Sequence, residues 1–188
     1  METVENKDKI TLGSGKLFYM EYTGTIPENT AIETEQNRLG YISGGATLEY
    51  KPSFYTAKDD LGMVSKEILT EEEVTFKSGV LTFNGKTLAI LSSTARVTDD
   101  SETGIRTVKI GGAGNQNGKS YVIHFLHEDP ADGDIRVTIV GTNQAGFTLA
   151  FAKDKETIID AEFKAKPHDD EGTLIRYQEE IPVVTPGG

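Results

Sequence analysis

The sequence predicts an all-β fold, a β-sandwich or barrel with one short flanking α-helix at about 86–94. Eight or more segments rich in strand-forming residues recur at near-regular spacing. Each has one apolar face, which is typical of strands that pack in a sandwich or barrel. The 20 glycines and the small number of candidate helices favour the same fold class.

The bulk composition is that of a water-soluble globular protein without a disulfide framework. The 188 residues suffice for one domain with a core, and neither a linker nor a repeat of fixed period divides them. The chain has no cysteine, which excludes thiolate metal sites and fits a reducing compartment. We expect no membrane span, because no apolar run approaches about 20 residues, and no secretory signal, because the polar N-terminus has no apolar segment.

The net charge of −11 bears on the kind of partner that the chain can bind. An acidic protein repels a phosphate backbone, so the sequence does not predict a protein that holds nucleic acid tightly. The simplest explanation of the charge is solubility. A more specific interpretation is that something anionic must pass the protein without binding to it.

The N-terminal part is expected to contain an arm, a strand and a loop. Residues 1–15 are polar and Gly-rich, so we predict an N-terminal arm there. Residues 16–22 (KLFYMEY) form a first strand, and a single domain is predicted over 16–181. The loop at 23–37 contains a short strand or a helical turn.

Residues 46–83 are interpreted as a β-hairpin whose strands exceed the usual length of about 5–6 residues. A polar connection at 58–62 joins the two strands. Pro52 lacks a backbone donor, so its strand is expected at a sheet edge or a bulge. The first strand alternates between an apolar face of Ala46, Leu48, Tyr50, Pro52 and Phe54 and a polar face of Thr47, Glu49, Lys51 and Ser53.

The second half of the chain is predicted to consist mostly of strands and turns. Asn84 and Gly85 mark the turn before the helix, and 96–102 is interpreted as an acidic turn. Phe147, Leu149 and Phe151 continue the apolar alternation, and 182–188 is expected to be a loose tail. Further strands are predicted at 104–110, 121–127, 134–141, 159–166 and 174–181.

One segment has the outline of a phosphate-binding loop. Residues 113–120 (AGNQNGKS) fit G-x-x-x-x-G-K-[ST] with Ala in place of the first glycine. The chemistry requires a helix after the loop, whose N-terminus holds the phosphates. Residues 121–125 are instead strongly strand-like, so we interpret the segment as a hairpin loop and expect no enzyme, no catalytic residue and no cofactor.

The histidines and acidic clusters do not predict a metal site. His124 and His127 lie three apart in a predicted strand, so their side chains point to opposite faces. His168 lies in an acidic loop, where a cation site is the weaker alternative to a solvated turn. Asp129 and Asp132 flank a proline as in an ordinary turn, with a spacing unlike a calcium loop.

Three long strings of the sequence carry a family resemblance: GGATLEYKPSFYTAKDDLGMVSKEILTEEE, SGVLTFNGKTL and GDIRVTIVGTNQAGFTLAFAKDKETIIDAEFKA. They resemble the tail tube (major tail) proteins of long-tailed phages and prophages of Gram-positive bacteria. The resemblance covers about 10–181 and implies a β-sandwich of the tail-tube type. It implies a structural virion protein whose hexameric rings stack into a tube that conducts the genome into the host.

The resemblance also implies partners, a location and contact residues. The partners are other copies of the chain, tape-measure, tail-terminator and baseplate or tip proteins, and duplex DNA in transient, non-specific passage; no membrane is implied. The location is the virion tail, with the host cytoplasm during assembly. The residues expected to face the tube lumen are Thr47, Glu49, Lys51 and Ser53. Those expected to contact the next ring are Lys58, Asp59, Asp60, Leu61, Gly62 and Met63.

Three alternatives stay open at the level of sequence. The first is a monomeric β-sandwich adhesion or carbohydrate-binding module, although the chain has no Trp for an aromatic platform. The second is a tube subunit of a phage-derived contractile injection system. The third is a nucleotidase that uses the phosphate-loop motif.

Overall fold

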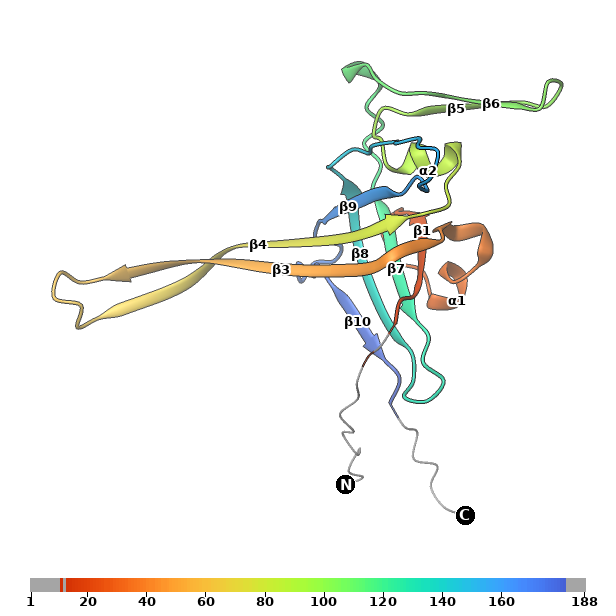
Figure 1. The fold of residues 1–188 in the computed structure, drawn as a ribbon. Coiled ribbons are helices and arrows are strands. Elements are labelled where there is room, and N and C mark those ends of the chain that lie inside the picture. Colours follow the sequence, from red (N-terminus) through yellow and green to blue (C-terminus); the bar gives the residue numbers. More distant parts are fainter. Residues whose placement is uncertain (1–10, 12, 182–188) are drawn as a thin grey trace, which may run out of the picture.

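Ten strands and two short α-helices make up the part of the chain that the computed structural model describes, residues 11 and 13–181 (Figure 1). All strand pairs are antiparallel, and the predicted all-β class is confirmed. The strands are β1 (Lys16–Glu21), β2 (Arg38–Gly40), β3 (Ile42–Lys58), β4 (Ser65–Val80), β5 (Arg96–Asp100), β6 (Ile105–Lys109), β7 (Tyr121–His127), β8 (Ile135–Asn143), β9 (Ile159–Ala165) and β10 (Arg176–Glu179). The helices are α1 (Asn29–Ile32) and α2 (Gly85–Ile90), and single 3-10 turns cover Glu35–Asn37 and Ala113–Asn115.

The main sheet bends over at β8, which gives the sandwich its two layers. The sheet order is β2-β1-β7-β8-β9-β4-β3, and β10 also pairs with β8. The first half of β8 pairs with β10, and its end, from Gly141 on, pairs with β9. Gly141 lies at this corner, where a Cβ would come 2.1 Å from the carbonyl oxygen of Lys164, so only glycine fits. In Figure 1, β3 and β4 cross over β7 and β8.

Two apolar clusters cover both faces of the layer formed by β1, β7 and β8. The larger cluster lies between this layer and β4, β9 and α2, and the smaller one lies beneath α1. In β7, Ile123 belongs to the larger cluster and Val122 to the smaller one. Burial on both faces explains why β7 is an almost continuous apolar run rather than an alternating one.

The predicted hairpin is confirmed and is the most extended feature of the molecule. β3 has 17 residues and β4 has 16, and they pair from Ile42 with Val80 to Lys58 with Ser65. β9 supports β4 only from Thr75 to Val80. The rest of the hairpin projects from the body as a two-stranded ribbon (Figure 1). We call residues 51–73 the hairpin arm.

In β3, the predicted edge position of Pro52 is confirmed, whereas the predicted packing of the apolar face on the core is only partly correct. β3 is the last strand of the sheet, so Pro52 lies on an edge as predicted. The apolar face was expected to pack on the core, but only Ala46 and Leu48 do so. Tyr50 and Phe54 are exposed because the core ends before the hairpin does.

Helical segments differ from the prediction in number and length. α2 ends at Ile90, so the predicted helix at 86–94 is correct in position but too long. Asn84 caps it, since its side chain accepts hydrogen bonds from the backbone N–H groups of Lys86 and Thr87. The ambiguous segment in the loop at 23–37 is helical and adds α1, which packs Ile32 into the smaller cluster.

Two segments of the second half were predicted wrongly. Residues 96–102 are not a simple acidic turn, because β5 pairs with β6 in a separate hairpin. Asp99 and Arg106 lie opposite each other in it and form an ion pair, which offsets one charge of the acidic run. Residues 147–151 alternate in sequence but form no strand, and Phe151 is exposed to solvent.

Parts of the predicted termini fall outside the described residues. This applies to the tail at 182–188 and to most of the N-terminal arm at 1–15. Residues 13–15 are described and lie along the end of β7, where the carbonyl of Ser14 contacts His127 Nδ1 at 2.7 Å. None of the helices in the described ranges is long and apolar enough to cross a membrane.

Candidate assembly surface

The hairpin arm contains a β-bulge that changes which residues share a face. Ser53 lies opposite Glu71, whereas Phe54 lies opposite Leu69, so Thr70 is an extra residue in β4. The Thr70 hydroxyl donates to the carbonyl of Ser53 at 3.1 Å. If the register of the first part of the hairpin continued without the bulge, Phe54 would lie opposite Thr70. The bulge therefore aligns apolar residues across the two strands.

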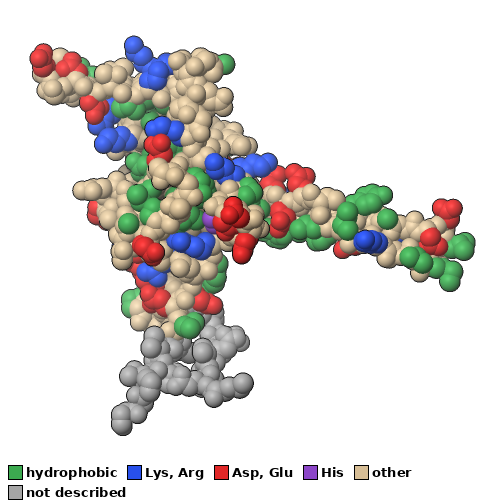
Figure 2. All heavy atoms as spheres, turned by 180° about the vertical axis from the view of Figure 1, so that it is seen from behind, with side chains coloured by type: hydrophobic (Ala, Val, Ile, Leu, Met, Phe, Trp, Pro, Cys, Tyr) green, Lys and Arg blue, Asp and Glu red, His purple; other side chains and the backbone are tan. Residues whose placement is uncertain are grey.

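Past the bulge, both faces of the hairpin arm are apolar and exposed. Phe54 pairs with Leu69 on one face and Tyr55 pairs with Ile68 on the other. These four side chains are 46–60% exposed. The arm holds seven of the fifteen exposed large apolar side chains among the described residues, so exposure is concentrated there. Figure 2 shows hydrophobic side chains along the arm and at its end.

At the tip of the arm, hydrogen bonds hold the backbone in a turn, whereas the apolar side chains are exposed to solvent. The backbone N–H of Val64 donates to Asp59 Oδ1 at 2.7 Å, and the N–H of Asp59 donates to the carbonyl of Val64 at 3.0 Å. The hydrogen bond from Val64 lowers the pKa of the Asp59 carboxyl. Gly62 takes a φ of 68°, which the tight turn requires. Leu61 and Met63 are 82% and 81% exposed, respectively, and contribute nothing to the core.

The residues predicted to face a lumen lie on one face of the sheet, as their alternation indicates. Thr47, Glu49 and Lys51 have partners on the same face of β4, and β9 extends this face. Lys51 forms an ion pair with Glu49 at 2.9 Å. Hydrogen bonding to Lys51 lowers the pKa of Glu49, so this carboxylate stays charged. Ser53 ends the face at the bulge.

This polar face is mixed in charge, with a small excess of acid. Its carboxylates are Glu49, Glu71, Glu73, Asp160 and Glu162, and its lysines are Lys51, Lys77 and Lys164. Five carboxylates against three lysines leave two negative charges. Cross-strand ion pairs join Lys77 to Glu162 and Lys164 to Glu73. The face is therefore hydrated and has no basic patch on which a phosphate backbone would bind.

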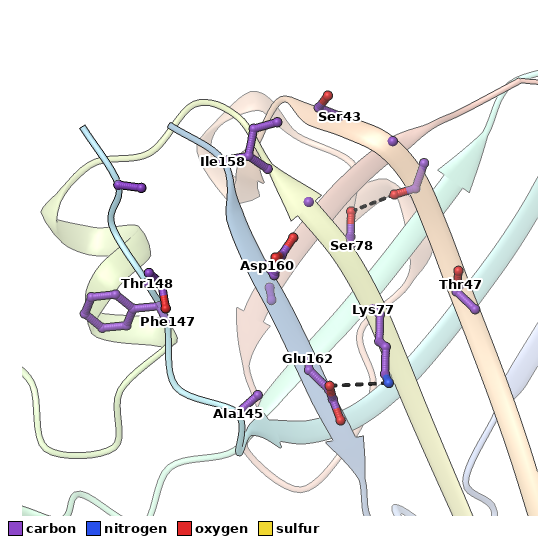
Figure 3. Close-up of a pocket in the computed structure, with 15 residues that line it drawn as sticks. Ser43, Thr47, Lys77, Ser78, Ala145, Phe147, Thr148, Ile158, Asp160 and Glu162 are labelled. Atoms are coloured by element: carbon purple, nitrogen blue, oxygen red, sulfur yellow. Dashed lines mark hydrogen bonds and ion pairs between the residues drawn. The ribbon is translucent and has the colours of Figure 1, made fainter. Parts of the chain in front are cut away.

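A groove of about 660 Å³ continues the polar face toward the loop at 144–158 (Figure 3). Gly44 and Gly45 form one wall, both with a φ near 78°, at an irregularity in the pairing of β3 with β4. Phe147 and Thr148 lie on the opposite wall (Figure 3). The groove shares Thr47, Lys77, Asp160 and Glu162 with the polar face, and Lys77 and Glu162 form an ion pair.

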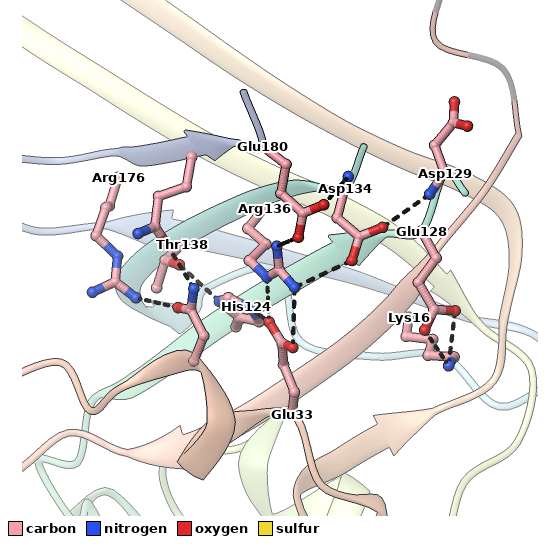
Figure 4. A network of polar contacts seen from close by, with 12 residues as sticks. Lys16, Glu33, His124, Glu128, Asp129, Asp134, Arg136, Thr138, Arg176 and Glu180 are labelled. Carbon is pink, nitrogen blue, oxygen red and sulfur yellow. Dashed lines mark hydrogen bonds and ion pairs between the residues drawn. The ribbon is translucent and has the colours of Figure 1, made fainter. Parts of the chain in front are cut away.

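A polar cluster around His124 was not predicted from the sequence (Figure 4). His124 is fully buried, with Nδ1 2.8 Å from the Thr138 hydroxyl and Nε2 2.9 Å from Glu33 Oε1. Arg136 Nε donates to the same Glu33 oxygen at 2.6 Å. Arg136 also pairs with Asp134 and Glu180. The cluster ties the segment after α1 to β7, β8 and the end of β10.

The protonation states in this cluster follow from burial and charge. Burial lowers the pKa of His124, so its ring is neutral at neutral pH. The Nε2–H tautomer then donates to Glu33, and Nδ1 accepts from Thr138. Burial raises the pKa of Glu33, but the hydrogen bonds from Arg136 and His124 outweigh it and the net shift is downward. Every polar group of the cluster is satisfied, which indicates a structural role.

The remaining candidate sites can be placed as well. The segment at 113–120 leads into β7 rather than a helix, and Lys119 pairs with Glu21 at 2.8 Å. The Asp129 carboxylate accepts from the backbone N–H groups of Ala131 and Asp132, as in an ordinary turn. No group of three or more acidic or His side chains within the described ranges is arranged to hold a metal ion. No family model matches the chain, and no curated protein matches it.

Proposed function

We propose that the protein is a structural subunit that assembles with copies of itself into stacked rings, forming a phage tail tube that conducts the genome. The observation that carries this proposal is the hairpin arm, which exposes apolar side chains on both faces and at its tip. The three strings that resemble tail tube proteins support it, since the first of them covers the whole arm.

The exposed apolar side chains and unpaired strand edges of the arm favour its association with another protein molecule. An isolated two-stranded hairpin is marginally stable in water, and exposed apolar strands with unpaired edges are an aggregation hazard. The arm has both features, since no strand of the described chain pairs with its outer edges. A ring of identical subunits covers such edges by closing on itself. The partner proposed for the arm is therefore another copy of the chain.

The polar face suits the wall of a water-filled channel for DNA. Thr47, Lys51 and Ser53 are exposed on it, Glu49 is partly exposed, and its carboxylates outnumber its lysines. A basic wall would hold the phosphate backbone through counterion release, whereas a weakly acidic wall does not. Under this proposal DNA passes without binding.

A paired substitution in the arm tests the proposal. Replacing Phe54 and Leu69 by Ser removes one apolar face of the arm, and both side chains are already about half exposed. We expect the fold to be unchanged by circular dichroism and assembly to be lost by sedimentation velocity. The matched control is Phe151→Ser, which removes an 81% exposed aromatic side chain from the body. Assembly of the double variant at the wild-type concentration would refute the role of the arm.

A further inference from the structure

A hollow of about 600 Å³ lies away from the hairpin arm, where the loop after β1 meets the loop between β9 and β10. Tyr22 and Ile26 line it from the first loop and His168 from the second, and Arg176 lines it from the start of β10. Neither the polar face nor the His124 cluster uses this hollow, although it contains two basic side chains.

Arg176 has no acidic partner within ion-pair distance among the described residues. Its one hydrogen bond runs from Nη2 to the side-chain oxygen of Asn29, at 3.1 Å, and its Nε is buried without a partner. Burial lowers the pKa of Arg176, and the charge of Glu28 opposes this only in part. Arg136, on the neighbouring strand, has three carboxylate partners. The charge of Arg176 is thus poorly compensated.

His168 is held in place through its backbone while its ring has no hydrogen bond. Its N–H donates to the carbonyl of Thr173 at 3.1 Å, and its carbonyl accepts from the Tyr22 hydroxyl at 2.9 Å. The side chain is 8% exposed, with Nδ1 buried and unpartnered. Nε2 lies 4.0 Å from Asp169 Oδ2, beyond hydrogen-bond distance. Asp169 is instead engaged by the backbone N–H of Thr173 at 2.8 Å.

We infer that this hollow is an oxyanion-binding site, in which Arg176 and His168 bind a single carboxylate or phosphate group. An oxyanion supplies both the missing negative charge and acceptors for the N–H donors of the two side chains. Asp169 and Asp170 also line the hollow, so an extended polyanion such as nucleic acid is repelled. The apolar wall at Ile26 favours an anion carried on a short aliphatic or peptide group.

The bound oxyanion can come from two sources, and only the first of them rests on the proposed function. The first is the carboxylate of Asp60 at the tip of the hairpin arm of another copy, beside the exposed Leu61. The second is a small anion free in solution. The first requires assembly, whereas the second is bound by an isolated subunit.

The test follows the ring of His168 by NMR as a function of pH, with and without sodium phosphate. Burial and the charge of Arg176 lower the pKa of His168, and Asp169 opposes them. A bound oxyanion favours the charged ring, so about 50 mM phosphate should raise this pKa by roughly half a unit or more in dilute protein. Arg176→Gln should abolish the rise. His127 serves as the internal control, and Lys153→Gln is the matched loss of an exposed charge.

Repeating the titration in chloride at rising protein concentration separates the two sources. A rise in the pKa of His168 with concentration that Asp60→Asn removes assigns the ligand to the arm of another copy. A rise with phosphate alone assigns a free anion. The inference is overturned if neither phosphate nor concentration moves the pKa. Failure of the chain to form rings leaves the phosphate result in dilute protein unchanged, so the two proposals fail separately.

Discussion

At the scale of single residues, the polar contacts of the body depend on partners that are remote in sequence. His124 and Glu33 are separated by 91 positions and still lie 2.9 Å apart. The sequence predicts that His124 and His127 point to opposite faces, and their Nδ1 atoms meet different partners, Thr138 and Ser14. Alternation therefore indicates the direction of a side chain in a strand but not what it meets there.

The buried histidine makes stability depend on pH. Burial lowers the pKa of His124 in the folded state below its unfolded value of about 6.5, so the unfolded state binds more protons as the pH falls. Its contribution to stability is complete above pH 6.5 and declines below it. His168 shifts in the same direction, and Glu33 adds a loss in more acidic solution. We expect the free energy of unfolding in urea to fall between pH 7 and pH 5.

Single substitutions distinguish the contributions of His124 and His168 to the pH dependence of the free energy of unfolding. Each contributes a slope of at most about 1.4 kcal/mol per pH unit. His124→Asn and His168→Asn should each flatten the dependence, whatever their effect on stability at pH 7. A wild-type stability that is constant from pH 7 to pH 5 would contradict the lowered pKa of both histidines.

At the scale of secondary-structure elements, period-two alternation predicted most strands well. It identified β3 and β9, each of which has one face on the core, and β8, which is covered by apolar clusters on both faces. It failed at 147–151, where Phe147 packs on the core while Phe151 is exposed and no strand forms. It also missed β5, because the acidic residues Asp99 and Asp100 are typical of a turn. Arg106 in the paired strand β6 stabilises β5 through its ion pair with Asp99. Cross-strand pairing decides such cases and is not visible in one segment.

A substitution at Gly141 tests how tightly β8 and β9 pack at the corner between the two layers. A Cβ at this position would lie 2.1 Å from the carbonyl oxygen of Lys164, so Gly141→Ala forces β8 and β9 apart. We expect a loss of about 3 kcal/mol in the free energy of unfolding, measured in urea. Gly114→Ala is the matched control, since nothing lies within 4 Å of its Cβ position and its φ is not positive. Equal effects of the two substitutions would show that the corner is not tightly packed.

At the scale of the whole molecule, the body and the hairpin arm differ in how they are stabilised. The body buries two apolar clusters on the faces of β1, β7 and β8, whereas the arm buries nothing. The sequence predicted the long hairpin and its polar face. It did not predict that the core would end at Leu48, because that depends on how far β9 extends along β4. Under the proposed function, another molecule covers the exposed apolar side chains of the arm.

The most direct test of this account is electron microscopy of the purified wild-type protein in negative stain, over a range of concentrations. Self-assembly through the hairpin arm predicts rings or tubes with a central hole, and sedimentation velocity should show the matching large species. A monomer that persists at every concentration, with no rings in any field, would contradict the account and favour a monomeric binding module.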